Sequence, residues 1–341
     1  MSLAASAIGL AERLPLPDLA LRAGIAGLVG RTARQLSTAP AGVAAFARAM
    51  DGYPVAEHTD AANAQHYELP PEFFRLVLGP RRKYSSCLYP LGTESLAQAE
   101  EAALAETVAH AGLQDGQAIL ELGCGWGSLT LYMAEHLPGA RILAVSNSRP
   151  QRAAILEQAA RRGLSNIEVV TADMNDFDTH ARFDRIVSVE MFEHMANWRA
   201  LLARARLWLA PEGRLFLHVF AHRAAPYRFD RTDPADWIAQ HFFTGGIMPS
   251  HDLAGGFPDL FAVERQWRWS GHHYRRTAEH WLENFDRNGT TIAAILAEVY
   301  GADAALWGRR WRLFFLATAG LFGHGDGSEW GVSHSVLRPA G

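Results

Sequence analysis

Three closely spaced glycines directly after a short apolar run constrain this chain more than any other feature of its sequence. Residues 118–122 are apolar apart from Glu121. Gly123, Gly125 and Gly127 follow, and a helical stretch begins after them. Glycine allows tight turns and close approach of a ligand to the backbone, because it has no Cβ atom. A strand, a glycine turn and a helix in this order predict a ligand-binding turn at the edge of a parallel sheet.

Strand-like and helix-like segments alternate after this turn. Apolar strands are predicted at residues 118–122, 140–145, 167–171, 183–189 and 214–220, with helices at 128–137, 151–162 and 198–209. Strands of a parallel sheet are buried on both faces and therefore form such continuous apolar runs. The alternation predicts an α/β fold with a doubly wound parallel sheet. Further strands are predicted at 261–269 and 330–337, with two or three helices in 277–321.

We expect one core with helical additions rather than several independent domains. Residues 1–110 are predicted to form a helical N-terminal cap, 111–220 the ligand-binding core, and 221–341 substrate-lid insertions plus the last core strands. A chain of 341 residues can bury a core of this kind without disulfides. The Ala- and Leu-rich residues 1–50 are expected to pack on the protein as helices, although their spaced arginines would also suit a membrane surface.

Composition and charge exclude several classes of protein. A formal net charge of −4 argues against nucleic-acid binding, which needs a clear basic excess. No apolar stretch reaches the length of about 20 residues that a membrane-spanning helix requires. Two cysteines cannot form a disulfide framework, and residues 1–11 lack the features of a signal peptide. We therefore expect a cytoplasmic protein whose contact with a membrane is at most peripheral. The sequence leaves its oligomeric state open, with a homodimer as the assembly considered.

The glycine turn is more specific than its glycines alone. A dinucleotide-binding turn would have its third glycine one residue later. Residues 121–127, Glu-Leu-Gly-Cys-Gly-Trp-Gly, instead resemble the E/D-x-G-x-G-x-G signature of class I S-adenosylmethionine (SAM) methyltransferases. That resemblance implies a seven-stranded Rossmann-like sheet, SAM as the cofactor and S-adenosylhomocysteine (SAH) as its product.

Polar residues follow the second and third predicted strands, where such a sheet binds its ligand. Asp173 and Met174 follow the third strand, and an acid with neighbouring backbone suits the adenine amino group. The second strand is followed by Ser146 and Asn147, with Gln151 beyond them, and lacks the acid that most of these enzymes use for the ribose hydroxyls. We expect these hydroxyl and amide side chains to take its place.

Stretches outside the cofactor turn extend the resemblance to a superfamily. The chain from about residue 65 onward is similar to the cyclopropane fatty acid synthase superfamily and, within it, to plant coclaurine and pavine type N-methyltransferases. The matching stretches are residues 67–73, 84–85, 190–195, 242–250 and 330–334. The cofactor-binding residues that the resemblance implies are Tyr84, Ser85, Glu121, Gly123, Gly125, Gly127, Ser146, Asn147, Gln151, Asp173 and Met174. The substrate-binding residues that it implies are Phe242, Phe243 and Trp330.

An acidic pair and a histidine follow the fourth predicted strand and indicate how an amine would be methylated. The methyl group of SAM is already activated, so positioning in a dry pocket is the main task. An amine with a pKa near that of lysine is protonated at neutral pH and must lose a proton before it attacks. The resemblance implies that Glu190 and Glu193 bind the amine and that His194 is the base or a proton relay. The expected reaction is N-methylation of a bulky cyclic or aromatic amine.

An unsaturated fatty acyl chain is the alternative methyl acceptor. Cyclopropane synthases use a bicarbonate ion as base, and the resemblance places its ligands at Ser86, Glu193, His218 and Tyr274. Glu190 stands where those synthases carry a small neutral residue, and a second carboxylate would repel the anion. Glu190 therefore favours the amine. A non-catalytic SAM-binding protein is a third alternative, which the acidic residues beside the cofactor turn argue against.

Four other features are expected to be mainly structural. Residues 81–83, Arg-Arg-Lys, contain the only lysine of the chain and are expected to form a solvated face. Residues 272–274 are predicted to form a turn from which only Tyr274 is functional. His218 and His222 lack further ligands at metal-binding spacing, so we expect no metal site. Nine of the ten tryptophans follow residue 190, and we expect most of these in the core and some in the acceptor pocket.

Overall fold

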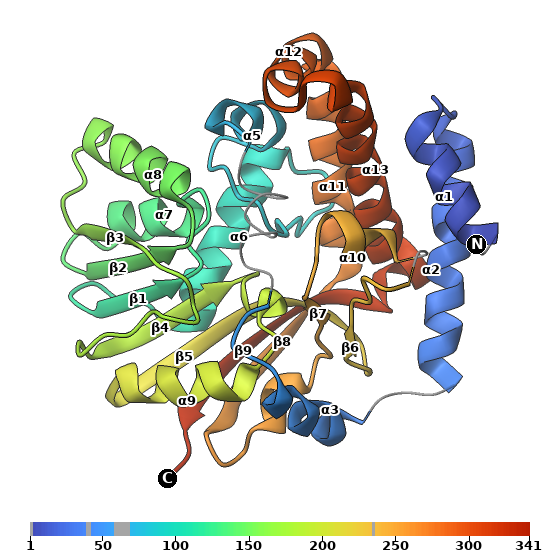
Figure 1. Ribbon diagram of the computed structural model, residues 1–341. Helices are drawn as coiled ribbons and strands as arrows, with labels where there is room; N and C mark the ends of the chain where they lie inside the picture. Colours follow the sequence, from blue (N-terminus) through green and yellow to red (C-terminus); the bar gives the residue numbers. More distant parts are fainter. Residues whose placement is uncertain (1–2, 39–41, 58–68, 234–235) are drawn as a thin grey trace.

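The computed structural model describes residues 3–38, 42–57, 69–233 and 236–341, and its centre is a seven-stranded sheet (Figure 1). The strand order is β3-β2-β1-β4-β5-β9-β8, with β1 to β5 parallel and β9 antiparallel to both of its neighbours. The strands are β1 (Ala118–Leu122), β2 (Arg141–Ser146), β3 (Ile167–Thr171), β4 (Phe183–Val189), β5 (Leu209–His222), β8 (Phe261–Ser270) and β9 (Trp330–Pro339). The predicted doubly wound α/β fold is confirmed.

Helices cover both faces of the sheet and build a cap at one end of it (Figure 1). On one face lie α6 (Leu96–Ala111), α7 (Ser128–His136) and α8 (Arg149–Arg161), and on the other lies α9 (Trp198–Trp208). The cap and its surroundings contain α1 (Leu3–Arg13), α2 (Asp18–Thr38), α3 (Val43–Ala49), α5 (Pro71–Val77), α10 (Trp237–His241), α11 (Gly271–Arg287), α12 (Gly289–Tyr300) and α13 (Ala304–Gly323). Helices α11 and α13 pack together, and α2 packs along α13. The short strands β6 (Tyr227–Arg228) and β7 (Ile247–Met248) pair separately.

The first strand illustrates how the sequence closes both faces of the sheet at once. Side chains of a strand point alternately to its two faces. Ile119 packs with residues of α6 and α7, whereas Leu120 and Leu122 pack with residues of α9. All three are completely buried. Apolar side chains are therefore needed on both faces of this strand. The burial of β1 fixes its position in the sheet, and the glycine turn follows at its carboxyl end.

Helix α6 ends against the sheet and carries His110 in its last turn. Ser95 and Gln98 form a capping box at its start, in which each side chain bonds the backbone of the other residue. Gly112 ends the helix in the left-handed conformation, with φ +62°. Because both ends are capped, the last turn of α6 has a defined position beside β5 and β9.

Two segments differ from the predictions. Helix α11 begins at Gly271, because the hydroxyl of Ser270 accepts a hydrogen bond from the backbone N–H of His272 and caps the helix. The prediction of a turn at residues 272–274 is therefore wrong, and Tyr274 lies on the first turn of a helix. Strand β5 begins at Leu209, earlier than predicted, since its first residues pair with β4.

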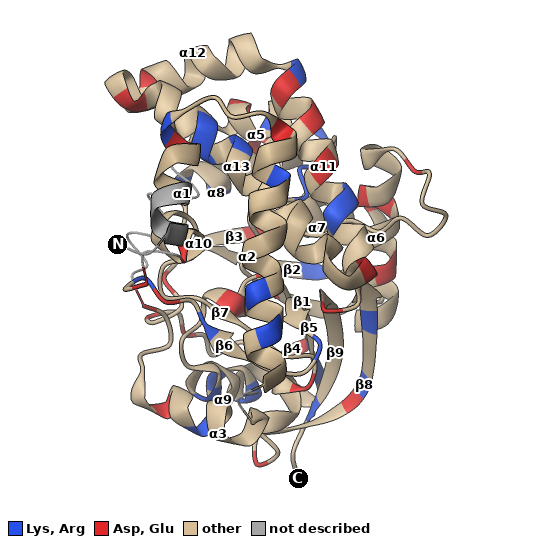
Figure 2. Ribbon diagram, turned by 90° about the vertical axis from the view of Figure 1, so that its right-hand side faces the viewer, with Lys and Arg blue, Asp and Glu red and all other residues tan. Residues whose placement is uncertain are grey.

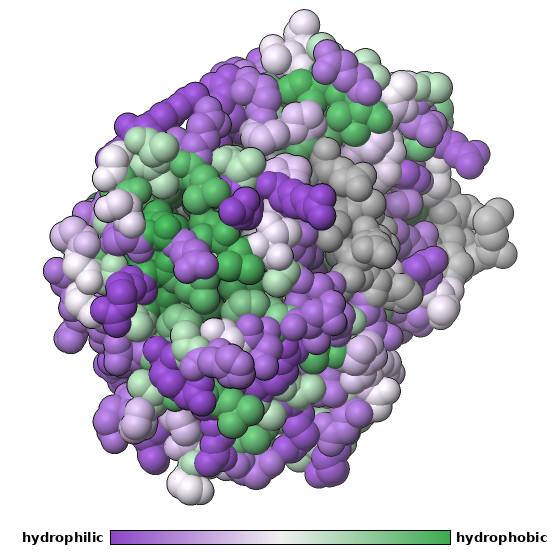
Figure 3. Space-filling view, turned by 60° about the vertical axis from the view of Figure 1, so that its left-hand side comes forward, coloured by the Kyte–Doolittle hydropathy of each residue, from purple (hydrophilic) through white to green (hydrophobic). Residues whose placement is uncertain are grey.

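The surface carries mixed charge and one apolar area in the views shown. Figure 2 shows acidic and basic residues interspersed over one side of the molecule. Figure 3 shows hydrophobic residues gathered on the side that carries β3 and α8, with hydrophilic residues around them. Within the described part of the chain, none of the helices combines the length and hydrophobicity needed to cross a lipid bilayer. Residues 67 and 68 of the first matching stretch lie outside the described residues.

Candidate active site

A cavity opens at the carboxyl ends of β1, β2, β3 and β4. It encloses about 1220 Å³, including the space at its open mouth. Its walls include the glycine turn after β1, the residues that follow the other three strands, and residues 82–85 of the segment before α6. Doubly wound sheets bind ligands at the carboxyl ends of their strands. The cavity therefore lies at the edge of the sheet that the sequence predicts.

The glycine turn is tight because neighbouring side chains leave no room for a Cβ atom. Gly123 has φ +79°, and a Cβ atom there would lie 2.5 Å from Cγ of Met191. Gly127 has φ +82°, and its Cβ atom would lie 2.6 Å from Cγ1 of Ile155. Gly125 differs, since no atom among the described residues lies within 4 Å of the place its Cβ would take. A ligand in the cavity can therefore approach the backbone of Gly125 closely.

Three buried polar atoms on residues that line the cavity form no hydrogen bond within the described part of the chain. They are Nε2 of Gln151, Nε1 of Trp126 and Oγ of Ser128. The hydroxyl of Ser146 donates to Oε1 of Gln151 at 2.7 Å, which engages the other end of that amide. Buried polar groups in proteins almost always have a hydrogen-bond partner. These atoms therefore indicate that the cavity receives a polar ligand.

Ten of the eleven predicted cofactor residues line this cavity, and the exception is Gly127, which packs against Ile155. Glu121 lies among the ten at the end of β1, and its Oε2 accepts a hydrogen bond from Oγ1 of Thr130 at 2.5 Å. Burial raises the pKa of Glu121 to about 7, because a carboxylate loses its hydration inside the protein. Tertiary folding thus brings together residues from three separate strand ends and from the segment before α6.

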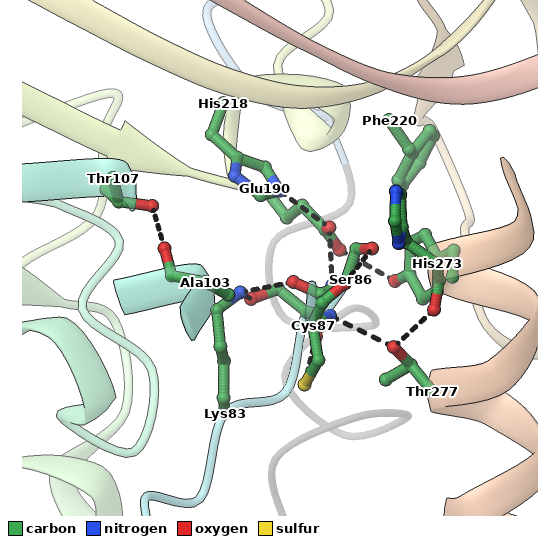
Figure 4. Close-up of polar contacts among 12 residues, drawn as sticks. Lys83, Ser86, Cys87, Ala103, Thr107, Glu190, His218, Phe220, His273 and Thr277 are labelled. Atoms are coloured by element: carbon green, nitrogen blue, oxygen red, sulfur yellow. Dashed lines mark hydrogen bonds and ion pairs between the residues drawn. The ribbon is translucent and has the colours of Figure 1, made fainter. Parts of the chain in front are cut away.

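Glu190, directly after β4, is the centre of a buried hydrogen-bonded cluster beside the cavity (Figure 4). Its Oε1 accepts a hydrogen bond from the backbone N–H of Ser86 at 2.9 Å and lies 3.1 Å from Nε2 of His218. Its Oε2 accepts a hydrogen bond from the hydroxyl of Tyr274 at 2.7 Å. These partners come from the segment before α6, from β5 and from α11. The three polar partners of this carboxyl group are far apart in the sequence, and folding brings them together.

The backbone of Glu190 is strained, because its φ of +48° lies in the left-handed region. That conformation costs a residue other than glycine about 1–2 kcal/mol. Such strain persists where the surroundings hold it, and it is concentrated at functional sites. Burial raises the pKa of Glu190, and the nearby Lys83 ammonium group opposes part of that rise. A carboxylate with a raised pKa is suited to act as a general base near neutral pH.

Lys83 is buried, so the prediction that residues 81–83 form a solvated face is wrong for this residue. Its side chain donates hydrogen bonds from Nζ to Oγ of Ser85 at 2.5 Å and to the carbonyl oxygen of Ser86 at 2.6 Å. Burial lowers the pKa of Lys83. One sequence feature could have indicated this buried position, since Lys83 is the only lysine in a chain whose other basic side chains of this type are all arginine. A compact ammonium group fits where the planar guanidinium group of arginine does not.

Glu193 and His194 lie on the short 3-10 helix η2 (Phe192–His194) but have different surroundings. His194 lines the cavity and stacks on Phe243, with ring centroids 4.8 Å apart. Burial lowers the pKa of His194 to about 4, so its ring is neutral at neutral pH. Glu193 is completely buried, accepts a hydrogen bond from the backbone N–H of Phe220 at 2.7 Å, and is absent from the described lining of the cavity. Amine binding by Glu193 stays a prediction.

Two of the three residues predicted to contact substrate belong to the core. Phe242 is completely buried and stacks on Phe314 with ring centroids 4.5 Å apart, and Trp330 is also completely buried. Neither is among the described residues that line the cavity, whereas Phe243 supports its wall through His194. Trp126 is the only tryptophan in that described lining. The expectation that some of the later tryptophans line the acceptor pocket stays a prediction, and the described lining of this cavity contains none of them.

The cavity combines two chemical environments. At the ends of β1, β2 and β3 the cavity is lined by glycine backbone, by polar atoms that lack a hydrogen-bond partner and by the carboxyl group of Glu121. These groups together suit a polar ligand that lies close to the backbone. At the end of β4 it presents a buried carboxyl group held by three partners. That group can hold a cation or take up a proton. Among the described residues, no group of three or more acidic, histidine or cysteine side chains is arranged to hold a metal ion.

Relatives of known activity match most of the chain. Residues 56–327 match the family model described as mycolic acid cyclopropane synthetase. (S)-Coclaurine N-methyltransferase of Thalictrum flavum subsp. glaucum is 35% identical over 289 residues, which is 83% of this chain and 80% of that protein. Cyclopropane-fatty-acyl-phospholipid synthase of Escherichia coli (strain K12) is 30% identical over 275 residues, which is 80% of this chain and 66% of that protein.

Solved structures match the fold over nearly the whole chain. A coclaurine N-methyltransferase bound to N-methylheliamine and SAH superposes with a TM-score of 0.92 and 31% sequence identity, covering 98% of this chain and 99% of that one. A cyclopropane synthase from Mycobacterium tuberculosis superposes with a TM-score of 0.68 and 24% identity, covering 83% of this chain and 99% of that one. At that identity the second match concerns the fold alone.

Proposed function

Because this chain belongs to the mycolic acid cyclopropane synthetase family and is a SAM-dependent methyltransferase, we propose that it methylates the nitrogen of a bulky cyclic or aromatic amine. The predicted family, enzyme class and cofactor are confirmed. The amine is favoured by the more similar relatives, which include an (S)-coclaurine and a pavine N-methyltransferase of Thalictrum flavum subsp. glaucum. The proposal carries that acceptor class over to this chain.

The surroundings of Glu190 are the observation that carries the proposal. Ser86, His218 and Tyr274 are three of the four positions at which the resemblance to cyclopropane synthases places bicarbonate. In this chain all three contact the carboxyl group of Glu190 instead. A built-in carboxylate thus takes the place of the external base, and bicarbonate beside it would meet a like charge. A carboxylate at this point also attracts a cationic amine, which an alkene substrate does not need.

The mechanism assigns proton transfer and positioning to residues of the chain. When bound, SAM supplies an electrophilic methyl group on a sulfonium ion. Glu190 accepts a proton from the substrate ammonium group, and the nitrogen keeps the electron pair with which it attacks. Tyr274 and the backbone N–H of Ser86 hold the carboxyl group in place by hydrogen bonds. His194 and Phe243 form a stacked wall beside it that excludes water.

The cavity residues of β1 to β3 are proposed to hold SAM. The unsatisfied atoms of Gln151, Trp126 and Ser128 supply hydrogen-bond donors, and the open backbone of Gly125 permits close approach. In the same proposal, residues 1–110 form a helical cap on the cofactor-binding core at 111–220. Residues 221–341 supply the substrate-lid insertions and the last core strands. A cytoplasmic location, a homodimer and peripheral membrane contact stay predictions.

A labelled-methyl assay tests the acceptor. We expect transfer from methyl-labelled SAM to cyclic secondary amines such as tetrahydroisoquinoline, with the same rate in bicarbonate-free and bicarbonate-supplemented buffer. Vesicles of monounsaturated phospholipid are the competing acceptor in the same panel. Label in the phospholipid together with a requirement for bicarbonate would support cyclopropanation and overturn the amine proposal.

The buried carboxyl group of Glu121 should make the stability of the cofactor-free protein depend on pH. The folded state holds a proton on Glu121 up to its raised pKa of about 7, whereas the unfolded chain releases that proton near the ordinary glutamate pKa of 4.5. Stability from this group is therefore present at low pH and is lost as pH rises to about 7, by about 3 kcal/mol in total. Between pH 5.5 and pH 8 the native protein should lose about 2 kcal/mol of unfolding free energy that Glu121→Gln keeps. Chemical denaturation of both proteins at the two pH values measures this difference.

The same variant reports on the cofactor. A cationic ligand beside Glu121 favours the ionised carboxylate, so SAM affinity of the native protein should rise from pH 6 to pH 8. Calorimetry of Glu121→Gln should show a weaker affinity with little change over that range. Equal pH dependence in the variant and the native protein would contradict the placement of SAM at Glu121.

A further inference from the structure

Three histidines form a continuous row from Glu190 to the molecular surface. Nε2 of His218 lies 3.1 Å from Oε1 of Glu190, and its Nδ1 lies 2.8 Å from Nε2 of His334. Nδ1 of His334 lies 2.8 Å from Nδ1 of His110. Nε2 of His110 lies 2.9 Å from Oε1 of Glu106, whose side chain is 42% exposed. Each ring therefore uses both of its nitrogens within the row.

The sheet register sets this row. His218 of β5 and His334 of β9 are direct partners in an antiparallel pair, so their side chains share one face of the sheet. Trp267 of β8 is the partner of His334 on the other side. Trp267 stacks on His110 of α6 with ring centroids 3.8 Å apart and 8° between the ring planes. Helix α6 and strands β9 and β8 lie next to one another on this side of the molecule (Figure 2).

The inner part of the row is dry, and its outer end reaches water. His218 and His334 are completely buried, and Phe216 and Trp269 pack against their rings. The side chain of His110 is 12% exposed. Burial lowers the pKa of all three histidines. Each ring is therefore neutral at neutral pH and can accept a hydrogen on one nitrogen while it donates from the other.

Charged groups stand at both ends of the row. Lys83 and the carboxyl group of Glu190 face the inner end. Glu106 and Arg265 face His110 at the outer end. The ammonium group of Lys83 disfavours a lasting positive charge on the inner rings, whereas Glu106 favours one on His110. This gradient of charge directs a mobile proton outward.

We propose that His218, His334 and His110 form a proton relay that carries the proton taken from the substrate by Glu190 out to Glu106 and solvent. The proposal rests on the amine-methylating function, because an ammonium substrate must lose one proton in each turnover. Glu190 lines the cavity, and in the proposed complex substrate and SAM fill the space between it and the open mouth, so a proton placed on it needs another way to water. The relay also returns Glu190 to the carboxylate form for the next substrate.

The number of ring N–H hydrogens shows that the row can take up one more proton. Four contacts join the two carboxyl groups through three rings, and three neutral imidazoles supply three hydrogens. With both carboxylates ionised, one contact therefore lacks a hydrogen, and an incoming proton fills it. The substrate N–H bond breaks as the O–H bond of Glu190 forms. Each ring then takes a proton on one nitrogen and gives one from the other, until Glu106 passes it to water.

One transit leaves each ring with its hydrogen on the opposite nitrogen. The rings must therefore turn or exchange hydrogens with water before the next transit. Enzymes turn over at about 10 s⁻¹ on average, which leaves time on the order of 0.1 s for this step. Local opening motions occur on timescales from microseconds to seconds, a range that includes this interval.

The test compares His334→Gln and His110→Ala with the native enzyme, with tetrahydroisoquinoline as the probe amine. At pH 7 we expect kcat to fall about 30-fold or more in His334→Gln, since assisted proton transfer contributes about 10²- to 10⁴-fold to catalysis. The loss of kcat should become smaller as pH rises towards 10. At that pH the amine binds in its unprotonated form, so no proton has to be removed from it in the active site. The solvent deuterium isotope effect on kcat should increase. Added imidazole should restore activity to His110→Ala.

His280→Gln is the matched control. His280 is half-buried on α11, and its Nδ1 lies 2.9 Å from the hydroxyl of Tyr89, outside the row. We expect this variant to keep the native kcat and pH profile. Calorimetry with SAH and thermal unfolding establish that each variant is folded, and a pH-independent loss with weaker SAH binding would overturn the relay in favour of a structural role.

Nitrogen-15 NMR of histidine-labelled protein tests the row without any substrate. We expect low-field ring N–H protons that are slow to exchange and that are lost together in His334→Gln. Their absence from the native enzyme would overturn the relay, as would an unchanged kcat in His334→Gln. Failure of the native enzyme to methylate any amine would instead overturn the proposed function, so the two failures are distinguishable.

Discussion

Replacing Glu190 by glutamine should lower kcat for amine methylation about 10³-fold, because the amide keeps the size of the side chain but cannot take a proton at neutral pH. The amide oxygen of glutamine can accept the hydrogen bond from the backbone N–H of Ser86, and its amino group can donate to the hydroxyl oxygen of Tyr274, so the fold around the site is expected to hold. The affinity for SAM should change less than about threefold, since that cofactor depends on other residues of the cavity. Single-turnover kinetics and calorimetry measure the two quantities separately.

Glu193→Gln provides the comparison for this variant. Glu193 is completely buried and lies three residues after Glu190, but it contacts the backbone of Phe220. We expect its replacement to lower kcat less than about tenfold, below the range typical of general-base catalysis. If Glu193→Gln lost as much activity as Glu190→Gln, the proton acceptor would be the pair of acids rather than Glu190. Unchanged turnover in Glu190→Gln would contradict the mechanism altogether.

Gly123→Ala should destabilise the protein and weaken SAM binding at the same time. A Cβ atom at residue 123 would lie 2.5 Å from Cγ and 2.6 Å from Cβ of Met191, and φ there is +79°. The left-handed backbone costs alanine about 1–2 kcal/mol, and the steric overlap adds about 1–3 kcal/mol. Met191 follows Glu190 directly, so moving it also disturbs the base. We expect a loss of about 2–5 kcal/mol in the free energy of unfolding and SAM affinity at least about tenfold lower.

Gly163→Ala separates backbone strain from steric overlap. Gly163 follows α8 with φ +68°, and no described atom lies within 4 Å of the place of its Cβ. We expect this variant to lose only the left-handed term of about 1–2 kcal/mol and to bind SAM normally. Chemical denaturation and calorimetry of both variants give the comparison. Equal losses of stability in the two variants would show that Met191 moves aside freely.

Local sequence patterns were enough to predict the core of the fold. The apolar run at β1, its glycine turn and the alternation that follows are determined by residues close together in the chain. The same holds for the capped end of α6 at Gly112. The start of α11 was missed, because one hydroxyl group, that of Ser270, caps the helix earlier than its apolar pattern suggests. The burial of Lys83 was missed, because it directly follows two arginines and a run of basic residues is usually solvated.

The sequence alone determined which chemical groups this protein has and at which strand ends they lie. Its glycine turn, its polar strand ends and Glu190 indicated a SAM-dependent methyltransferase, since these signals are local and tied to one ligand. Only the tertiary structure decided what Glu190 contacts. Its partners lie 28, 84 and 104 residues away, and sheet register places His218 opposite His334 across 116 residues. Register depends on how whole strands pack, so no short pattern in the chain encodes these contacts.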